Sequence, residues 1–279
     1  MFHINNPLEG GEATARHKFE PHRVNEPLKE KRDMASNKKS KKNQTQTLLL
    51  PADLGISDSL YATCVTFLFD RPEKDELNGE AWYWSLDADE HEFNPSPIEW
   101  VKLQTLIFAR CGEDLKRFSD EQVGLGLNYL MSNAVGDASC AAADPSVSID
   151  DAMRMMEHFP TLWRACIGPR LAGVHNRIGY GNGELGYVCY MWFDVWPTFY
   201  QNRNKPEWRD AMWRLFVELL SMPCREVQVS ALHGLGHEGR YLGRKKDIDQ
   251  LIYTFVASVA STDEALIDYA EAARQGMVQ

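Results

Sequence analysis

The chain has 279 residues, the size of one large domain or two smaller ones. Its 44% hydrophobic and 25% charged residues are enough to bury a full core, which excludes a collagenous or wholly disordered protein. The net charge of −10 is uneven: residues 1–46 carry +4 and residues 47–279 carry −14. An acidic body repels the phosphate backbone, so this part of the chain is a poor general nucleic-acid binder.

Residues 1–46 are polar and charged without helical or strand periodicity, so we expect a disordered basic tail. Its most basic stretch, residues 29–42, includes the run Lys38–Lys42 and is where a contact with nucleic acid would be made. The phrase beginning Met34-Ala35 is typical of a natural start. It suggests the hypothesis that residues 1–33 are an upstream extension of the native protein.

The compartment is inferred from what the chain lacks. Its first residues have neither the basic start nor the apolar core of a secretory signal, and no segment reaches the roughly 20 apolar residues that span a bilayer. The six cysteines lie 23 to 47 residues apart without a C-x-x-C pair, which excludes a zinc knuckle. We therefore expect a cytoplasmic protein whose cysteines are small buried hydrophobes.

The body is predicted to be helical from about residue 57 onward. Residues 96–99 combine an N-cap serine, a proline at the first helical position and a glutamate that can close a capping box. Ser119 repeats this start signal before a second apolar face. Helical spacing of apolar residues over 152–159 predicts a third helix, which Pro160 is expected to end.

The C-terminal half predicts two pairs of antiparallel helices. One pair opens at Pro206 and continues in a helix near Pro223, and the other opens at Asp247 and continues near Thr262. The one candidate strand is the short aromatic segment 81–86. The body is therefore predicted to be all-α, with paired antiparallel helices.

The two pairs start 41 residues apart, within the period of HEAT-type repeats. Within the first pair, the segment Val227–Gly236 (VQVSALHGLG) resembles the core helix of a HEAT repeat, and the phrase ALHGLGH is similar to one in uncharacterised bacterial helical proteins, some of them plausible toxin-immunity partners. The resemblance implies an α-solenoid whose stacked helix pairs expose a long surface for another macromolecule.

His233 and His237 are four residues apart, so both can project from one face of a helix, as in H-E-x-x-H metal sites. Gly234 and Gly236 weaken that helix, so the sequence favours a packing or capping role at a helix end. The alternative is a metal site, with a third ligand from another segment: Asp194, Glu218 or His175.

The segment from Tyr187 to Tyr200 is the densest aromatic run. Its apolar residues surround the helix, which favours burial on several sides. The alternative is an exposed aromatic anchor, because Trp and Tyr dominate binding hot spots. In that case Trp192, Asp194 and Trp196 would mark a binding surface.

The function expected from the sequence is a cytoplasmic protein-interaction module, an adaptor or immunity-type protein, without catalytic activity or cofactor. The acidic body would favour a basic protein as its partner, because opposite charge steers approach, and no membrane contact is expected. Two alternatives remain: a metal-dependent hydrolase using His233 and His237, and a nucleic-acid-associated protein acting through the tail.

Overall fold

The computed structural model describes residues 48–73, 80–84, 93–134, 136–179, 183–259 and 262–278. Every regular element in these ranges is helical, which confirms the all-α prediction for the described part of the body. The chain divides into two units, residues 1–45 and 46–279, and the fold below is that of the second unit. The predicted basic tail, its lysine run and the hypothetical start at Met34 lie outside the described residues.

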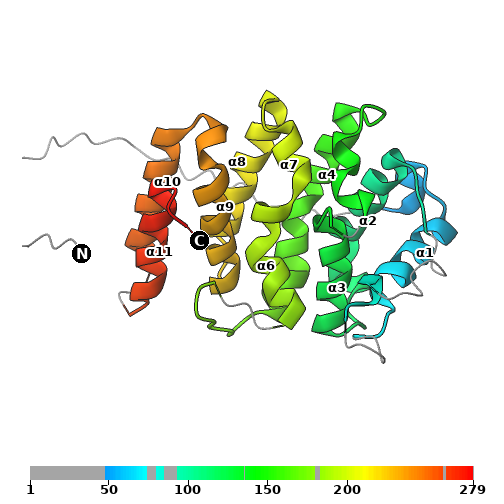
Figure 1. The fold of residues 1–279 in the computed structure, drawn as a ribbon, viewed down its shortest axis with the longest axis horizontal. Helices are drawn as coiled ribbons and strands as arrows, with labels where there is room; N and C mark the ends of the chain where they lie inside the picture. The colour runs from blue at the N-terminus through cyan, green and yellow to red at the C-terminus, as the bar shows by residue number, and fades with distance from the viewer. Residues whose placement is uncertain are drawn as a thin grey trace, which may run out of the picture. The chain divides into compact units, whose positions relative to one another are not determined.

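The second unit is built from helices, which are numbered α1 to α11 along the chain (Figure 1). The α-helices are α1 (Asp58–Phe69), α2 (Pro97–Asp114), α3 (Asp120–Met131), α4 (Ile149–Leu162), α5 (Gly168–Arg170), α6 (Gly183–Val195), α7 (Pro197–Asn202), α8 (Pro206–Leu220), α9 (Arg225–Leu242), α10 (Lys245–Ser258) and α11 (Glu264–Gln275). Short 3-10 helices are η1 (Pro51–Leu54), η2 (Trp82–Trp84) and η4 (Asp137–Ala143), and a π-helical segment, η5 (Trp163–Ile167), joins α4 to α5.

The predicted capping signals start helices where expected. The Ser96 backbone N–H donates to Glu99 Oε2 at 2.8 Å, which closes the capping box before α2. The Gln122 backbone N–H donates to Ser119 Oγ at 3.1 Å, so Ser119 caps α3. In both cases side chains satisfy backbone donors that the first turn of a helix leaves without partners.

The candidate strand over residues 81–86 is wrong where it is described, because Trp82–Trp84 forms the 3-10 helix η2. The Trp82 ring is buried, stacks on Tyr129 at 5.4 Å between centroids and meets the edge of Phe67 at 5.2 Å. These contacts come from helices on either side of the segment. The aromatic residues of this segment therefore belong to a short helical turn that packs between two helices.

Pro160 does not end its helix. It lies inside α4, and the chain continues through Leu162 into the π-helical segment η5. A proline in a helix interior costs about 3 kcal/mol or more. Phe159, Leu162 and Trp163 are fully buried, and their burial outweighs that cost because each contributes about 1.5–3 kcal/mol.

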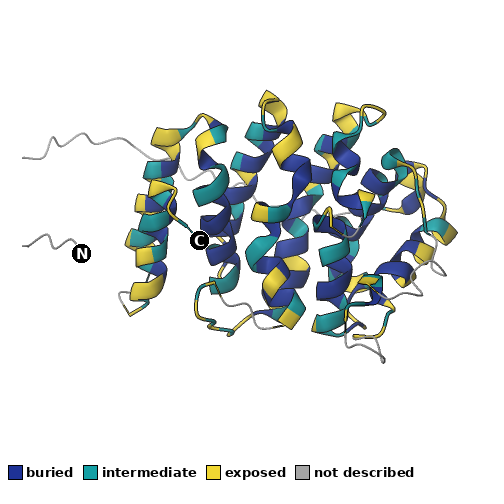
Figure 2. Ribbon diagram, viewed as in Figure 1, coloured by how far each residue is buried: buried dark blue, intermediate teal, exposed yellow. Residues whose placement is uncertain are grey.

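Neighbouring helices pack side by side along the second unit (Figure 1). α2 packs on α4, α3 on α6, α6 on α9, and α9 on both α8 and α11, with α10 against α11. Figure 2 shows the buried residues between neighbouring helices and the exposed residues on the outward faces and in the connecting loops. This packing brings α6, α9 and α11 together, and these three helices carry the candidate site.

The cysteine prediction is confirmed for five residues. All six cysteines have free thiols, and all are buried except Cys140, which is half-buried. Within the described residues, no helix has the length and apolar character needed to cross a membrane.

Candidate metal centre

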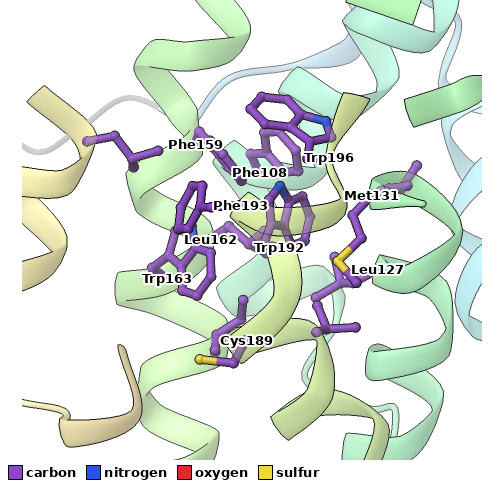
Figure 3. Packing of buried hydrophobic residues seen from close by; sticks show 14 of the residues in the cluster. Phe108, Leu127, Met131, Phe159, Leu162, Trp163, Cys189, Trp192, Phe193 and Trp196 are labelled. Atoms are coloured by element: carbon purple, nitrogen blue, oxygen red, sulfur yellow. The ribbon is translucent and has the colours of Figure 1, made fainter. Parts of the chain in front are cut away.

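The two tryptophans named as surface anchors, Trp192 and Trp196, lie in the core (Figure 3). Their exposed fractions are 1% and 3%. The Phe159 ring of α4 lies 5.2 Å from the Trp192 ring and 5.3 Å from the Trp196 ring, between centroids. Core packing therefore explains both residues, and their assignment to a binding surface is corrected because neighbouring helices cover the rings.

Asp194 lies on the other side of α6 and is exposed. The helical period separates it from Trp192 and Trp196, which point inward. The exposed aromatic side chains of this run are Tyr187, 42% exposed, and Tyr200, 60% exposed, and Tyr190 is half-buried. Of the predicted binding surface, Asp194 alone is accessible in the structure.

His233 and His237 project from α9, which runs without interruption from Arg225 to Leu242. The expectation that the pair straddles a helix end is wrong. The intervening glycines have a packing role instead: a Cβ at Gly234 would overlap the rings of Phe216 and Phe193, and one at Gly236 would overlap Val278. Absence of side chains at these positions allows neighbouring segments to lie against α9.

Asp194 joins the two histidines, as one of the third ligands considered from the sequence. One potential ligand atom from each of Asp194, His233 and His237 lies within 4.8 Å of the others. His237 Nδ1 is 3.7 Å from Asp194 Oδ1, and the two imidazole ring centroids are 4.5 Å apart. The packing of α6 on α9 thus brings the Asp194 carboxylate next to two imidazoles that lie about 40 residues further along the sequence.

The other two possible third ligands lie elsewhere. Glu218 of α8 forms an ion pair with Arg164. His175 lies near Asp263, whose pKa it helps to lower after the stronger effect of Arg225. Neither belongs to the group formed by Asp194 and the two histidines.

Tyr269 of α11 holds the buried imidazole in place. His233 Nδ1 is 2.7 Å from the Tyr269 hydroxyl, which is 3.0 Å from the hydroxyl of Tyr190 on α6. When Nδ1 carries the ring proton, it donates to Tyr269, and the lone pair of Nε2 remains available. Metal-binding histidines usually have such a partner on their second nitrogen, because it sets the tautomer and the orientation of the ring.

Little in the sequence indicates that Tyr190 and Tyr269 belong to this site. Tyr269 lies three residues after Leu266 and four before Ala273, a helical spacing that indicates burial but nothing about the tyrosine hydroxyl. Tyr190 belongs to the aromatic run, and its ring lies 4.2 Å from the His233 ring, between centroids. The packing of α11 on α9 places the Tyr269 hydroxyl on His233, and Tyr190 on α6 contacts that hydroxyl.

Burial keeps His233 neutral. Its side chain is 1% exposed, and this burial, together with the neighbouring His237, lowers its pKa to about 3. A neutral imidazole has the lone pair that metal coordination requires. The buried Nε2 atoms of His233 and His237 make no hydrogen bond in the structure, so both nitrogens are without a polar partner.

Glu238 adds a second carboxyl group next to His237. Burial raises its pKa to about 7; the cations Arg203 and Arg240 oppose this shift and Asp194 adds to it. Its Oε2 atom is buried and makes no hydrogen bond. The metal group therefore consists of two imidazoles and the exposed carboxylate of Asp194, and Glu238 is close enough to Asp194 for that carboxylate to raise its pKa.

Comparison of the chain with protein-family models, with curated proteins and with solved structures found no significant match.

Proposed function

We propose that this protein binds one divalent transition-metal ion of the Zn²⁺ class through Asp194, His233 and His237. The observation that carries the proposal is the buried His233 imidazole, whose Nδ1 contacts Tyr269 and whose Nε2 has no hydrogen bond. Leaving a buried polar atom without a partner costs about 1–3 kcal/mol. Coordination of a cation would satisfy this nitrogen.

The donor set suits such an ion. Two imidazoles and one carboxylate bind Zn²⁺ at about 2.0–2.2 Å, and three protein ligands leave a fourth position open for water. Ligand atoms around a tetrahedral Zn²⁺ are about 3.3 Å apart. Closing to that spacing from 4.8 Å needs small rotations of Asp194 and His237, whose side chains are 37% and 32% exposed.

The direct test is metal analysis of untagged protein stripped with a chelator and titrated with Zn²⁺ or Co²⁺. We expect one ion per chain, and for Co²⁺ the visible absorption of a four-coordinate site. His237→Ala and Asp194→Asn should weaken binding by at least about tenfold, the range expected from removal of a site residue. These two side chains are partly exposed, so their replacement leaves the core intact.

His158→Ala is the matched control, because His158 is a half-buried histidine on α4, outside the metal group. Saturating Zn²⁺ at about 100 times Kd should stabilise the parent protein and this control by about 2.7 kcal/mol through mass action. The proposal is wrong if the ion fails to bind stoichiometrically, or if His237→Ala binds it as tightly as the parent.

Hydrolysis is a reaction that such an ion would support, since a Zn²⁺-bound water has a pKa of about 7. Glu238, adjacent to His237, would accept the proton of that water. A Glu238→Gln variant should keep the ion and lose hydrolysis of nitrophenyl esters by the loaded protein. Equal rates in the variant and the parent would remove Glu238 from this role.

We also propose that the helical body is a HEAT-like protein-interaction module. The support for this second function is the packing of α8 with α9 and α10 with α11 in chain order, and the net charge of −14 over residues 47–279. Stacked helix pairs expose extended surfaces. The negative charge favours a basic partner.

A further inference from the structure

A groove of about 750 Å³ lies between η2 and the helices α3 and α6, away from the two histidines. Its described lining combines aromatic rings with carboxylates and contains no lysine or arginine. Trp84 and Tyr187 are 50% and 42% exposed, so both rings are available to a ligand. Tyr83 meets the edge of Trp84 at 5.5 Å between centroids and accepts a hydrogen bond from Asn128 Nδ2 at 3.0 Å, which holds its ring in position.

A carboxylate gives part of the wall of this groove a negative charge. Glu184 lies in its wall, with a buried Oε2 atom that makes no hydrogen bond. The Glu184 backbone N–H donates to Glu121 Oε2 at 3.2 Å, so a second carboxylate lies next to the first. Within the described part of the chain, neither Glu184 nor Glu121 forms an ion pair. Burial of Glu184 and the nearby charge of Glu121 raise the pKa of Glu184. A cation entering the groove would stabilise the charged form of Glu184.

We propose that this groove binds a lysine side chain presented by a basic polypeptide, between the rings of Trp84 and Tyr187 and the carboxylate of Glu184. The proposal deepens the second function above, the interaction module, by naming its site and the chemistry of its partner; it does not depend on the metal centre.

The chemistry of the lining fits an ammonium group on an apolar stem. Aromatic faces attract cations, most strongly when the site is partly shielded from water. The methylene groups of a lysine can cover the rings while the ammonium reaches the carboxylate. A polypeptide is favoured as the source of this cation because the whole body carries −14, which attracts a partner with several positive charges.

The test uses the full chain and a fluorescein-labelled peptide of alternating glycine and lysine, with binding followed by fluorescence anisotropy at two salt concentrations. A matched peptide with every lysine acetylated keeps the length but removes the charge. We expect saturable binding of the lysine peptide, weaker at higher salt, and no binding of the acetylated one.

Three variants distinguish peptide binding in this groove from nonspecific attraction by the acidic surface. Trp84→Ala and Glu184→Gln should each weaken the lysine peptide by about tenfold, the scale of one shielded cation–ring or charge contact. Tyr187→Phe, which keeps the ring, should bind within about twofold of the parent. Tyr253→Ala is the control, because Tyr253 is 70% exposed on α10 and lies outside the groove.

The proposal is overturned by absence of saturable binding, by equal affinity for the acetylated peptide, or by unchanged affinity in both Trp84→Ala and Glu184→Gln. Its failure can be told apart from failure of the metal site. His237→Ala should weaken binding of the ion and leave the affinity for the peptide unchanged, whereas Glu184→Gln should weaken binding of the peptide and leave the affinity for the ion unchanged.

Discussion

Gly234 sets how closely the rings of Phe216 and Phe193 approach the helix that carries both histidines. A methyl group there would overlap these rings, and both residues are buried with little room to move. Gly239, on the same helix, differs: a Cβ there would lie 3.2 Å from Cδ1 of Ile248, the end of a flexible side chain. Of these two glycines of α9, Gly234 therefore leaves no room for a methyl group, whereas Gly239 faces a side chain that can move.

Gly234→Ala should therefore destabilise the protein by about 1–3 kcal/mol, the usual penalty of overpacking. Gly239→Ala should lie within about 1 kcal/mol of the parent, because alanine's helix propensity offsets the closer contact. Urea unfolding followed by circular dichroism measures both. A Gly234→Ala protein as stable as Gly239→Ala would show that the rings can move aside.

The start of α11 is tied to the start of α9 by one carboxylate. Arg225 Nε donates to Asp263 Oδ2 at 2.8 Å, and Asp263 Oδ1 accepts from the Leu266 backbone N–H at 3.2 Å, capping α11. The hydrogen bond from Arg225 holds the pKa of Asp263 below its usual value. Because Tyr269 lies on α11, this contact also fixes the element that orients His233.

Asp263→Asn keeps a capping side chain but removes the charge, and should cost about 1 kcal/mol, since the pair is only partly screened by water. The Asp263 pKa is lowered in the folded state, so its contribution is full above the unfolded pKa of about 3.9 and is lost as pH falls through the folded value. The stability difference between parent and variant should shrink accordingly in unfolding experiments below pH 4.

Asp247→Asn is the control for this pair. Asp247 is 55% exposed and lies 3.4 Å from Arg244, and pairs of this kind contribute less than about 0.5 kcal/mol. A difference for Asp263→Asn that persists unchanged at pH 2 would mean that its charge is not the cause.

Over the second unit as a whole, burial is uneven along the chain. α2 contributes nine buried residues, whereas α10 contributes three. Local opening needs least free energy where few apolar contacts are lost. Local stability is therefore expected to be higher in α2 than in α10, although α10 is regular along its length.

Hydrogen exchange followed by mass spectrometry should show slower amide exchange in α2 than in α10. Peptides from α9 serve as an internal reference, because this helix is packed between α6, α8 and α11. Slower exchange in α10 than in α2 would contradict the expectation and would imply that the exposed face of α10 is covered in solution.

Local sequence signals are enough to predict several of the helix starts. The capping boxes at Ser96 and Ser119 and the helix start at Pro206 depend on interactions within one turn, and they are where the sequence predicted them. Pro160 was misjudged because its local cost is outweighed by burial of neighbours against distant helices. The strand expected over 81–86 is wrong in its described part, residues 81–84, for the same reason, since the Trp82 ring packs on α1 and α3.

Composition and apolar periodicity are enough to predict that the body is helical and acidic, and a spacing of four residues allows His233 and His237 to share one helix face. That α9 continues through both histidines, and which residues join them, depends on tertiary packing. Packing of α6 and α11 on α9 brings Asp194, and neither Glu218 nor His175, to the two histidines and places Tyr269 on His233. Trp192 and Trp196 are buried on another side, against Phe159 of α4. These are contacts across long sequence separations, and the periodicity of one helix carries no information about which neighbour covers it.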